Sequence, residues 1–346
     1  MIRPWIFEFA NSFGPTDPEA YDPAAAADDL AWYQRLWVEF EAIGFEGIFF
    51  SEHHFRLPSL APSPNLLIAA LAARTRTLRL GTMGNVVTFY EPWRLAEEFG
   101  MLDLLSGGRL EIGLASGVGP MEFRAIGMTD EEMRPRFAEA LDVLDAALTQ
   151  PRFTHRGQRW KFDGLSIVPR PLQRPTPRRW MTGLGRPTAE LAASRGCCFC
   201  TGFMSVARVQ DVFAGYREAA AAAGHEVGSG HLGLRRQVLL GDDAGAVREL
   251  AGARLRGLQS ALAGLPPPKD ARVADAPAHG PLVGDEESIA GTPAEVAGQI
   301  IDQCRRTGAG HFLAYLFAGF TREQVWRSYE LWREVIPRLR AARIGT

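Results

Sequence analysis

Residues 46–55, EGIFFSEHHF, decide the fold of this chain. An apolar run at residues 48–50 continues directly into four polar residues at 51–54. An unbroken apolar run is typical of a strand buried on both faces of a parallel sheet, and polar groups at its carboxyl end indicate a site. In a (β/α)8 barrel that end carries the catalytic side chains. We therefore predict an α/β protein, a (β/α)8 TIM barrel whose site includes residues 51–54.

The rest of the chain repeats the alternation of a short apolar run and a longer helical segment. The chain has 346 residues, and a barrel takes roughly 250 of them, which leaves roughly 100 for insertions. We expect one barrel domain over residues 1–346. The strands are predicted at residues 5–9, 46–55, 78–87, 110–115, 179–182, 197–203, 234–240 and 312–317. The helices are predicted at residues 24–44, 62–74, 92–105, 133–148, 187–195, 205–223, 292–307 and 321–336.

Two segments interrupt this alternation. Residues 151–178 alternate like strands and contain many prolines, which predicts an antiparallel ribbon on the rim of the barrel. Residues 262–290 are polar and rich in proline, so we expect a long loop that acts as a lid. A glycine-rich loop is expected directly after the fourth strand, at residues 116–128.

Composition excludes several classes of partner. The 38 Lys and Arg residues nearly balance 40 Asp and Glu residues, so no charge excess predicts binding to nucleic acid or to an anionic membrane. No window approaches the roughly 18 apolar residues of a membrane span, and the amino terminus does not resemble a secretion signal. We expect a soluble, cytoplasmic protein. Its four cysteines are expected to be buried structural thiols.

Four motifs carry a resemblance to a known family. They are SEHHF at residues 51–55, GTMGNVV at 81–87, FGMLDLLSGGRLEIGLASG at 99–117 and GTPAEVAGQI at 291–300. Together they resemble the bacterial luciferase-like flavin monooxygenases, and the resemblance covers nearly the whole chain. It implies a flavin site at the carboxyl face of the barrel.

The resemblance implies that His53 faces the flavin and is catalytic. An imidazole titrates near neutral pH, so His53 can serve as an acid or base there. A structural histidine at a strand end is the alternative, and it is our interpretation of His54. Because successive strand residues face opposite sides, the two histidines do not share a metal. Glu52 and His54 share a face, but no further cluster of ligands accompanies them, so we expect no metal.

The same resemblance places the flavin against other segments. Met83-Gly84 matches a non-proline cis peptide beneath the isoalloxazine ring, with an ordinary glycine bulge as the alternative. The turn GLGRPTAE after the fifth strand opens a helix, which predicts a phosphate site. Arg134 matches a phosphate contact, although Arg136 is an equal candidate from sequence. The full set of predicted cofactor contacts is Glu52, Met83, Gly84, Ser116, Gly117, Arg134, Thr182, Gly183, Leu184, Gly185 and Thr188.

One position departs from the pattern of true luciferases. They carry a reactive cysteine at the end of the fourth strand, where this chain has Ala115. We therefore expect a monooxygenase that does not emit light. The predicted substrate contacts are Phe7, Phe55, Ala115 and Phe203, and further apolar walls are expected from Phe9, Phe50, Phe89 and Tyr90, with plain barrel packing as the alternative.

The expected function is therefore that of a two-component monooxygenase. Reduced FMN from a separate flavin reductase and O2 would serve to oxygenate a small organic substrate. Three alternatives stay open: a deazaflavin-dependent oxidoreductase of the same family, a flavin-binding protein without catalysis, and a metallohydrolase. The resemblance also implies a homodimer through the second and third helices, where Leu67, Leu71 and Leu95 are available.

Overall fold

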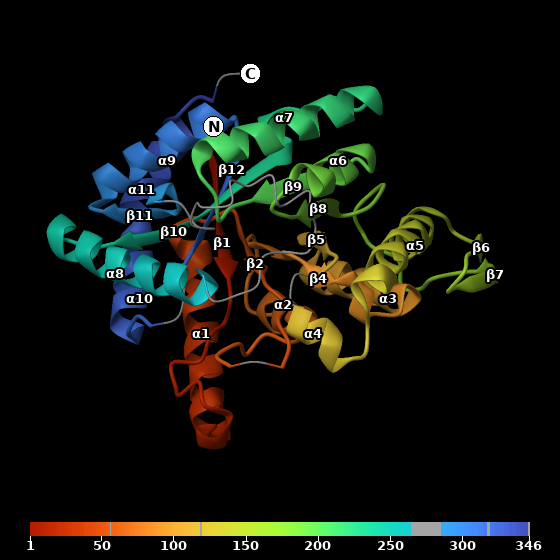
Figure 1. Cartoon of the computed structure of the whole chain (residues 1–346), viewed down its shortest axis with the longest axis horizontal. Helices are drawn as coiled ribbons and strands as arrows, with labels where there is room; N and C mark the ends of the chain where they lie inside the picture. Colours follow the sequence, from red (N-terminus) through yellow and green to blue (C-terminus); the bar gives the residue numbers. More distant parts are fainter. Residues whose placement is uncertain (56, 118–119, 264–284, 317–318, 345–346) are drawn as a thin grey trace.

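Eight parallel strands close into a barrel with helices around it (Figure 1). The computed structural model describes residues 1–55, 57–117, 120–263, 285–316 and 319–344. The barrel order is β12, β1, β2, β3, β5, β8, β9 and β10, and β10 pairs with both β9 and β12 to close it. The barrel strands are β1 (Arg3–Glu8), β2 (Gly47–Phe50), β3 (Arg79–Thr82), β5 (Leu110–Ala115), β8 (Arg178–Thr182), β9 (Cys198–Thr201), β10 (Leu232–Leu240) and β12 (His311–Tyr315). The predicted TIM barrel is confirmed.

The helices follow the strands as predicted, with shifted ends. The long helices are α1 (Pro23–Ile43), α2 (Pro64–Ala72), α3 (Pro92–Ser106), α5 (Asp130–Thr149), α6 (Arg186–Ser194), α7 (Val206–Ala222), α8 (Ala244–Ala263), α9 (Pro293–Thr307), α10 (Arg322–Glu330) and α11 (Trp332–Ala341). Local chemistry sets the ends of α1: the Asp22 side chain accepts from Ala24 N, and Gly44 ends the helix in the left-handed conformation at φ 104°.

Several predicted elements differ from the observed ones. The predicted third strand divides into β3 and β4 (Asn85–Val86), and the predicted last helix divides into α10 and α11 at Leu331. The glycine-rich loop contains a short helix, α4 (Pro120–Ala125). Helix α5 begins at Asp130 rather than 133, because Thr129 and Glu132 form a capping box. Arg134 and Arg136 therefore lie in its second turn.

The insertions were predicted in part. Strands β6 (Phe153–Arg156) and β7 (Lys161–Leu165) pair antiparallel and form the predicted rim ribbon. Strand β11 (Ser288–Gly291) was missed because its four residues follow a long polar segment; it pairs in parallel with β10. Short 3-10 turns occur at Pro18–Ala20, Val87–Phe89, Ser229–His231 and Asp285–Glu287. Residues 264–284 of the predicted lid lie outside the described residues.

Two apolar clusters occupy the two sides of the barrel wall. The outer one packs the strands against the helices, and the inner one fills the barrel with Trp5, Phe7, Phe49, Met83, Trp180, Cys198, Cys200, Leu313 and Tyr315. Side chains alternate along β2, so Phe49 points inward and Phe50 packs outward on Trp37, with ring centroids 4.8 Å apart. Phe50 is thus a core residue and not a wall of the site. The four cysteines are buried and free, as predicted.

None of the helices in the described part of the chain is both long and apolar enough to cross a bilayer.

Candidate active site

A hollow of about 760 Å³, open solvent at its mouth included, lies at the carboxyl ends of the barrel strands. Aromatic rings and small residues make up most of its wall, and polar groups from β2, α4 and β10 reach into it. Its lining residues are Phe7, Phe9, Ser51, Glu52, His53, Met83, Gly84, Val86, Ala115, Ser116, Gly117, Glu122, Thr182, Gly183, Leu184, Phe203 and Arg235.

His53 is held between an aromatic ring and a carboxylate. Its imidazole stacks on Phe9, with centroids 6.1 Å apart and an interplanar angle of 10°. Its Nδ1 lies 3.5 Å from Oε1 of Glu122 on α4. The same oxygen accepts a hydrogen bond of 3.1 Å from the backbone N–H of His54. Because Nδ1 faces the carboxylate, Nε2 is the ring nitrogen that remains for a ligand.

Glu52 and His54 belong to a buried network beside the hollow. Glu52 Oε1 lies 3.0 Å from His54 Nε2, and its Oε2 accepts from Tyr90 Oη at 2.8 Å and from Asn85 Nδ2 at 3.1 Å. Burial and the Glu52 charge raise the pKa of Tyr90. The network ties the end of β2 to β4, which fits a structural role for His54 and fixes the backbone on either side of His53.

The Met83–Gly84 peptide bond is cis, as predicted, and both residues line the hollow. Gly84 is required here by the neighbouring strand: a Cβ would lie 2.8 Å from the backbone of Gly113 and Leu114 on β5. The sequence interpretation, which placed this glycine beneath the flavin ring, did not predict the contact with β5.

The turn between β8 and α6 forms another part of the wall. Thr182, Gly183 and Leu184 line the hollow, and Thr201 Oγ1 donates to Gly183 O at 2.7 Å. Helix α6 has Gly185 as its N-cap, with no side-chain cap hydrogen bond. The N–H groups of its first turn therefore suit an anion.

The polar atoms of the wall include two that are buried without a hydrogen-bond partner in the described chain: Ser51 Oγ and Arg235 Nε. Arg235 comes from β10, and its guanidinium carbon lies 4.5 Å from the ring centre of Phe7 and 4.4 Å from that of Phe203. The described residues contain no group of three or more His, Cys, Asp and Glu that could hold a metal ion.

An outer hollow of about 1110 Å³, again including open solvent, adjoins the same histidine. It is lined by residues from α1, from the turn before it and from the segment after His53, among them Tyr21, Leu30, Phe55 and Leu57. His53 lines both hollows and so stands between them.

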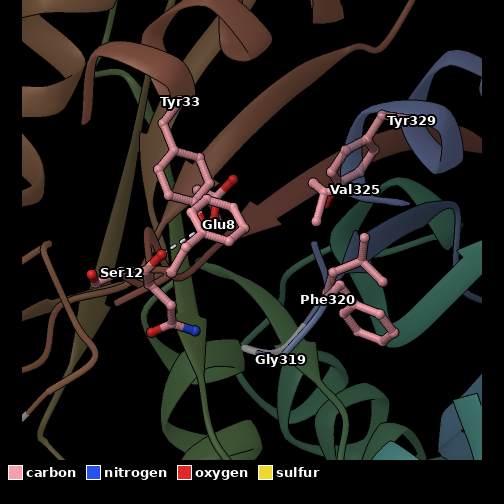
Figure 2. A pocket seen from close by; sticks show the side chains of 10 residues that line it. Glu8, Ser12, Tyr33, Gly319, Phe320, Val325 and Tyr329 are labelled. Carbon is pink, nitrogen blue, oxygen red and sulfur yellow. Dashed lines mark hydrogen bonds between the residues drawn. The ribbon is translucent and has the colours of Figure 1, made fainter. Parts of the chain in front are cut away.

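A smaller hollow of about 350 Å³ lies between β1, α1 and α10. Figure 2 shows Glu8 beside Ser12 and Tyr33, with Phe320, Val325 and Tyr329 across from them. Burial raises the pKa of Glu8. Its carboxylate accepts from Ala10 N at 2.8 Å and from Trp37 Nε1 at 3.0 Å. Both oxygens are used within the fold, so this hollow is structural.

A sequence model described as luciferase-like monooxygenase matches residues 9–311. The chain belongs to the luciferase-like monooxygenase family. This membership supports a flavin-dependent oxidoreductase.

Relatives of this family member span different shares of its length. It is 31% identical over 315 residues to the uncharacterised protein y4wF of Sinorhizobium fredii, which covers 89% of this chain and 91% of that protein. It is 35% identical over 156 residues to the oxygenase component of a flavin-dependent trigonelline monooxygenase of Acinetobacter baylyi; that match covers only 44% of this chain and 43% of the relative.

Two solved structures of family members share the fold. Monooxygenase RslO1 from Streptomyces bottropensis superposes with a TM-score of 0.81 at 26% identity, over 97% of this chain and 99% of the other. The oxygenating constituent of 3,6-diketocamphane monooxygenase from Pseudomonas putida, solved with FMN, has a TM-score of 0.77 at 20% identity and covers 98% of both chains.

The barrel of this family member brings most of the predicted site residues together. Those that line the inner hollow are His53, Glu52, Met83, Gly84, Ser116, Gly117, Thr182, Gly183, Leu184, Phe7, Ala115 and Phe203. Thr188 lies directly behind this wall, since a Cβ on Gly183 would be 2.7 Å from Thr188 Cβ. Gly185 lies next to the lining residues, at the start of α6.

Other predicted residues lie elsewhere. Phe55 is 62% exposed and lines the outer hollow, because the chain turns at its positive φ of 57°. Arg134 is exposed on α5 and is not among the lining residues. Arg136 donates to Thr88 O at 2.8 Å and stacks on Trp160. Phe89 packs on His54 and Phe123, outside the inner hollow.

Sequence reasoning missed three polar residues of the wall: Ser51, Glu122 and Arg235. Ser51 was noted only as part of the strand end. Glu122 fell in a segment predicted to be a loop. Arg235 stands within the apolar run LGLRRQVLL, and a charge inside a buried strand was a usable signal of a site.

Proposed function

We propose that this chain is the oxygenase component of a two-component monooxygenase, which uses reduced FMN from a separate reductase and O2 to oxygenate a small organic substrate. One observation carries the proposal. His53, the Met83–Gly84 peptide and the turn before α6 all contribute to a single hollow at the carboxyl face of the barrel.

The residues present fit FMN. The uncapped start of α6 offers backbone donors to the phosphate, and Arg134 is the proposed charge partner. Arg186 does not compete for that phosphate, because its guanidinium is bound by Asp211 and Glu218. Met83, Gly84, Ser116 and Gly117 would contact the ring and the ribityl chain. When bound, reduced FMN supplies the two electrons that let one oxygen atom of O2 enter the substrate while the other leaves as water.

The chain itself positions groups and excludes water. His53 holds a proton at Nε2 toward the hollow or accepts one there, with its ring fixed by Phe9 and Glu122. Phe7, Phe9 and Phe203 exclude water from the inner wall. The outer hollow gives a substrate an apolar approach that passes His53.

The proposed assembly is a homodimer that acts in the cytoplasm, where four free cysteines persist. The residues first considered for the interface need correction: Leu71 and Leu95 are buried in the core of one chain, and Leu67 packs against that core. Helices α2 and α3 instead expose Leu66, Met101, Leu104 and Leu105. Light scattering should therefore give the mass of two chains.

An anaerobic titration tests the cofactor assignment. Purified protein is titrated with reduced FMN and, in parallel, with reduced deazaflavin cofactor F420. We expect FMN to bind at least about tenfold more tightly, a difference of about 1.4 kcal/mol. Tighter binding of the deazaflavin would instead support hydride transfer without oxygen, and absence of binding by either would remove the proposal.

A further inference from the structure

Among the described residues that line the hollow, Arg235 is the buried charged side chain that has no ion-pair partner within the fold. Its side chain lines the hollow and the residue is only 6% exposed. Phe7 and Phe203 cover the guanidinium at 4.5 and 4.4 Å, so a ligand can approach its donors at the edge of the planar group. Nε is itself buried against the wall and has no hydrogen-bond partner in the described chain, so the ligand meets the guanidinium at its terminal Nη donors.

Glu287 is the carboxylate that interacts electrostatically with Arg235, but its oxygens already accept hydrogen bonds from other residues. Glu287 Oε2 accepts from Arg236 at 2.9 Å, and Glu287 Oε1 accepts from Tyr315 Oη at 2.8 Å. Glu287 and Arg236 are both fully buried. Two guanidinium groups thus stand beside one carboxylate, which leaves an excess positive charge on the Arg235 side of the hollow.

The acidic groups of the hollow lie on other elements. Glu52 follows β2 and is bound by His54, Asn85 and Tyr90. Glu122 lies on α4 and contacts the two histidines. The charges of the hollow are therefore separated: the acidic residues Glu52 and Glu122 lie on the β2 and α4 side, and the cationic Arg235 lies on the β10 side.

An unpaired cation costs several kcal/mol to bury, and aromatic faces offset only part of that cost. A ligand with two oxygen acceptors in the plane of the guanidinium would offset the rest of this desolvation cost, as carboxylates do when they pair with arginine. We propose that Arg235 binds a carboxylate of the substrate, so that this enzyme acts on small organic acids.

The position of β10 favours the substrate over the flavin as the source of that anion. In the closed barrel, β10 is four strands from β3 in either direction, so Arg235 stands across the barrel from Met83–Gly84. The inference rests on the proposed function in one respect: a flavin ring seated on Met83–Gly84 leaves the β10 side to the substrate.

The test compares acids with amides of the same shape. Benzoate, phenylacetate and hexanoate are each paired with their primary amide, and binding is measured by ligand-observed NMR on the protein alone and on the FMN-loaded protein. We expect at least one acid to bind about tenfold more tightly than its amide. Arg235→Met should bring the acid-to-amide ratio to within about twofold, and Arg235→Lys should retain part of the preference.

Arg254→Met is the matched control, since Arg254 also lies over a phenylalanine, Phe320, but is exposed and does not line the hollow. It should keep the acid preference of the unchanged protein. The proposal falls if no acid outbinds its amide, or if Arg235→Met keeps the preference. If Arg235→Met keeps the preference and also binds reduced FMN more weakly, Arg235 serves the flavin instead of the substrate. Failure to bind FMN at all removes the proposed function, yet the measurement on the protein alone still decides the acid preference.

Discussion

The orientation of His53 depends on residues far from it in the chain. Phe9 stacks on one face of the imidazole, and Glu122 holds its Nδ1 side. The two flanking residues, Glu52 and His54, are bound to each other and so fix the backbone between them. A proton donor or acceptor held in this way loses little entropy when a substrate arrives.

We therefore predict that His53→Ala lowers turnover by about a hundredfold or more, the usual contribution of a positioned acid or base. Affinity for reduced FMN should stay within about threefold. Turnover is followed by mass spectrometry as conversion of a small organic substrate, and affinity by anaerobic titration. His155→Ala serves as control, because His155 lies on the rim ribbon, where it pairs with Glu139 of α5. Equal turnover in the His53 variant and its parent would show that the histidine is structural.

At this scale the sequence indicated the strand-end residues but not their partners. The motif SEHHF located His53, because a polar group after a buried strand must lie at the barrel mouth. The contact with Glu122 was not predictable, since it spans 69 positions and depends on where a short helix falls after a glycine-rich loop.

At the scale of elements, the glycines of the site differ in what they allow. A Cβ at Gly84 would lie 2.8 Å from the backbone of β5, which cannot move without disturbing the barrel. A Cβ at Gly185 would meet only Pro187 Cδ, at 3.6 Å. Both glycines were predicted as cofactor contacts, yet the structure requires glycine only at the first.

Gly84→Ala should therefore lower the free energy of unfolding by about 1 to 3 kcal/mol, the usual cost of an overpacked interior, and weaken FMN binding. Gly185→Ala is the matched control, and its free energy of unfolding should change by no more than about 0.5 kcal/mol. Urea denaturation measures both. Equal stability of the two variants would mean that β3 and β5 can separate at little cost.

The sequence predicted the barrel elements because each buried strand is an apolar run and each helix has its own end signals, such as Asp22 and Gly44 around α1. It missed β11 and the break at Leu331. Neither has a local signal: β11 is a strand because β10 offers a free edge at residues 237–240, and the residues around Leu331 are all acceptable in one continuous helix.

For the whole molecule, the two ends of the barrel differ in how they are filled. The carboxyl end is hollow, while polar side chains close the amino end. Trp180 Nε1 donates to Glu111 at 2.6 Å, and Arg79 pairs with the same acid. His311 on β12 accepts from Trp5 Nε1 on β1 at 2.8 Å and lies 3.1 Å from Gly230 O. His311 therefore links two strands of the wall while it is neutral.

This arrangement makes barrel stability depend on pH. Burial, with the charges of Arg178 and Arg3, lowers the pKa of His311 to about 3 from its ordinary 6.5. Between about pH 3 and pH 6.5, His311 binds a proton in the unfolded chain but not in the folded chain. The free energy of unfolding therefore rises with pH across this window and falls on acidification. From pH 6.5 to 4.5 this group alone should remove about 2 kcal/mol from the free energy of unfolding.

His311→Gln isolates that contribution, because glutamine does not titrate while the carboxylates act alike in both proteins. The variant will be less stable at pH 6.5, since the Trp5 contact is altered, but the test concerns the slope. Urea denaturation at pH 6.5, 5.5 and 4.5 should show the two proteins converging by about 2 kcal/mol as the pH falls. Parallel curves would mean that His311 is protonated inside the barrel, and the Trp5 to His311 hydrogen bond could not then exist as described.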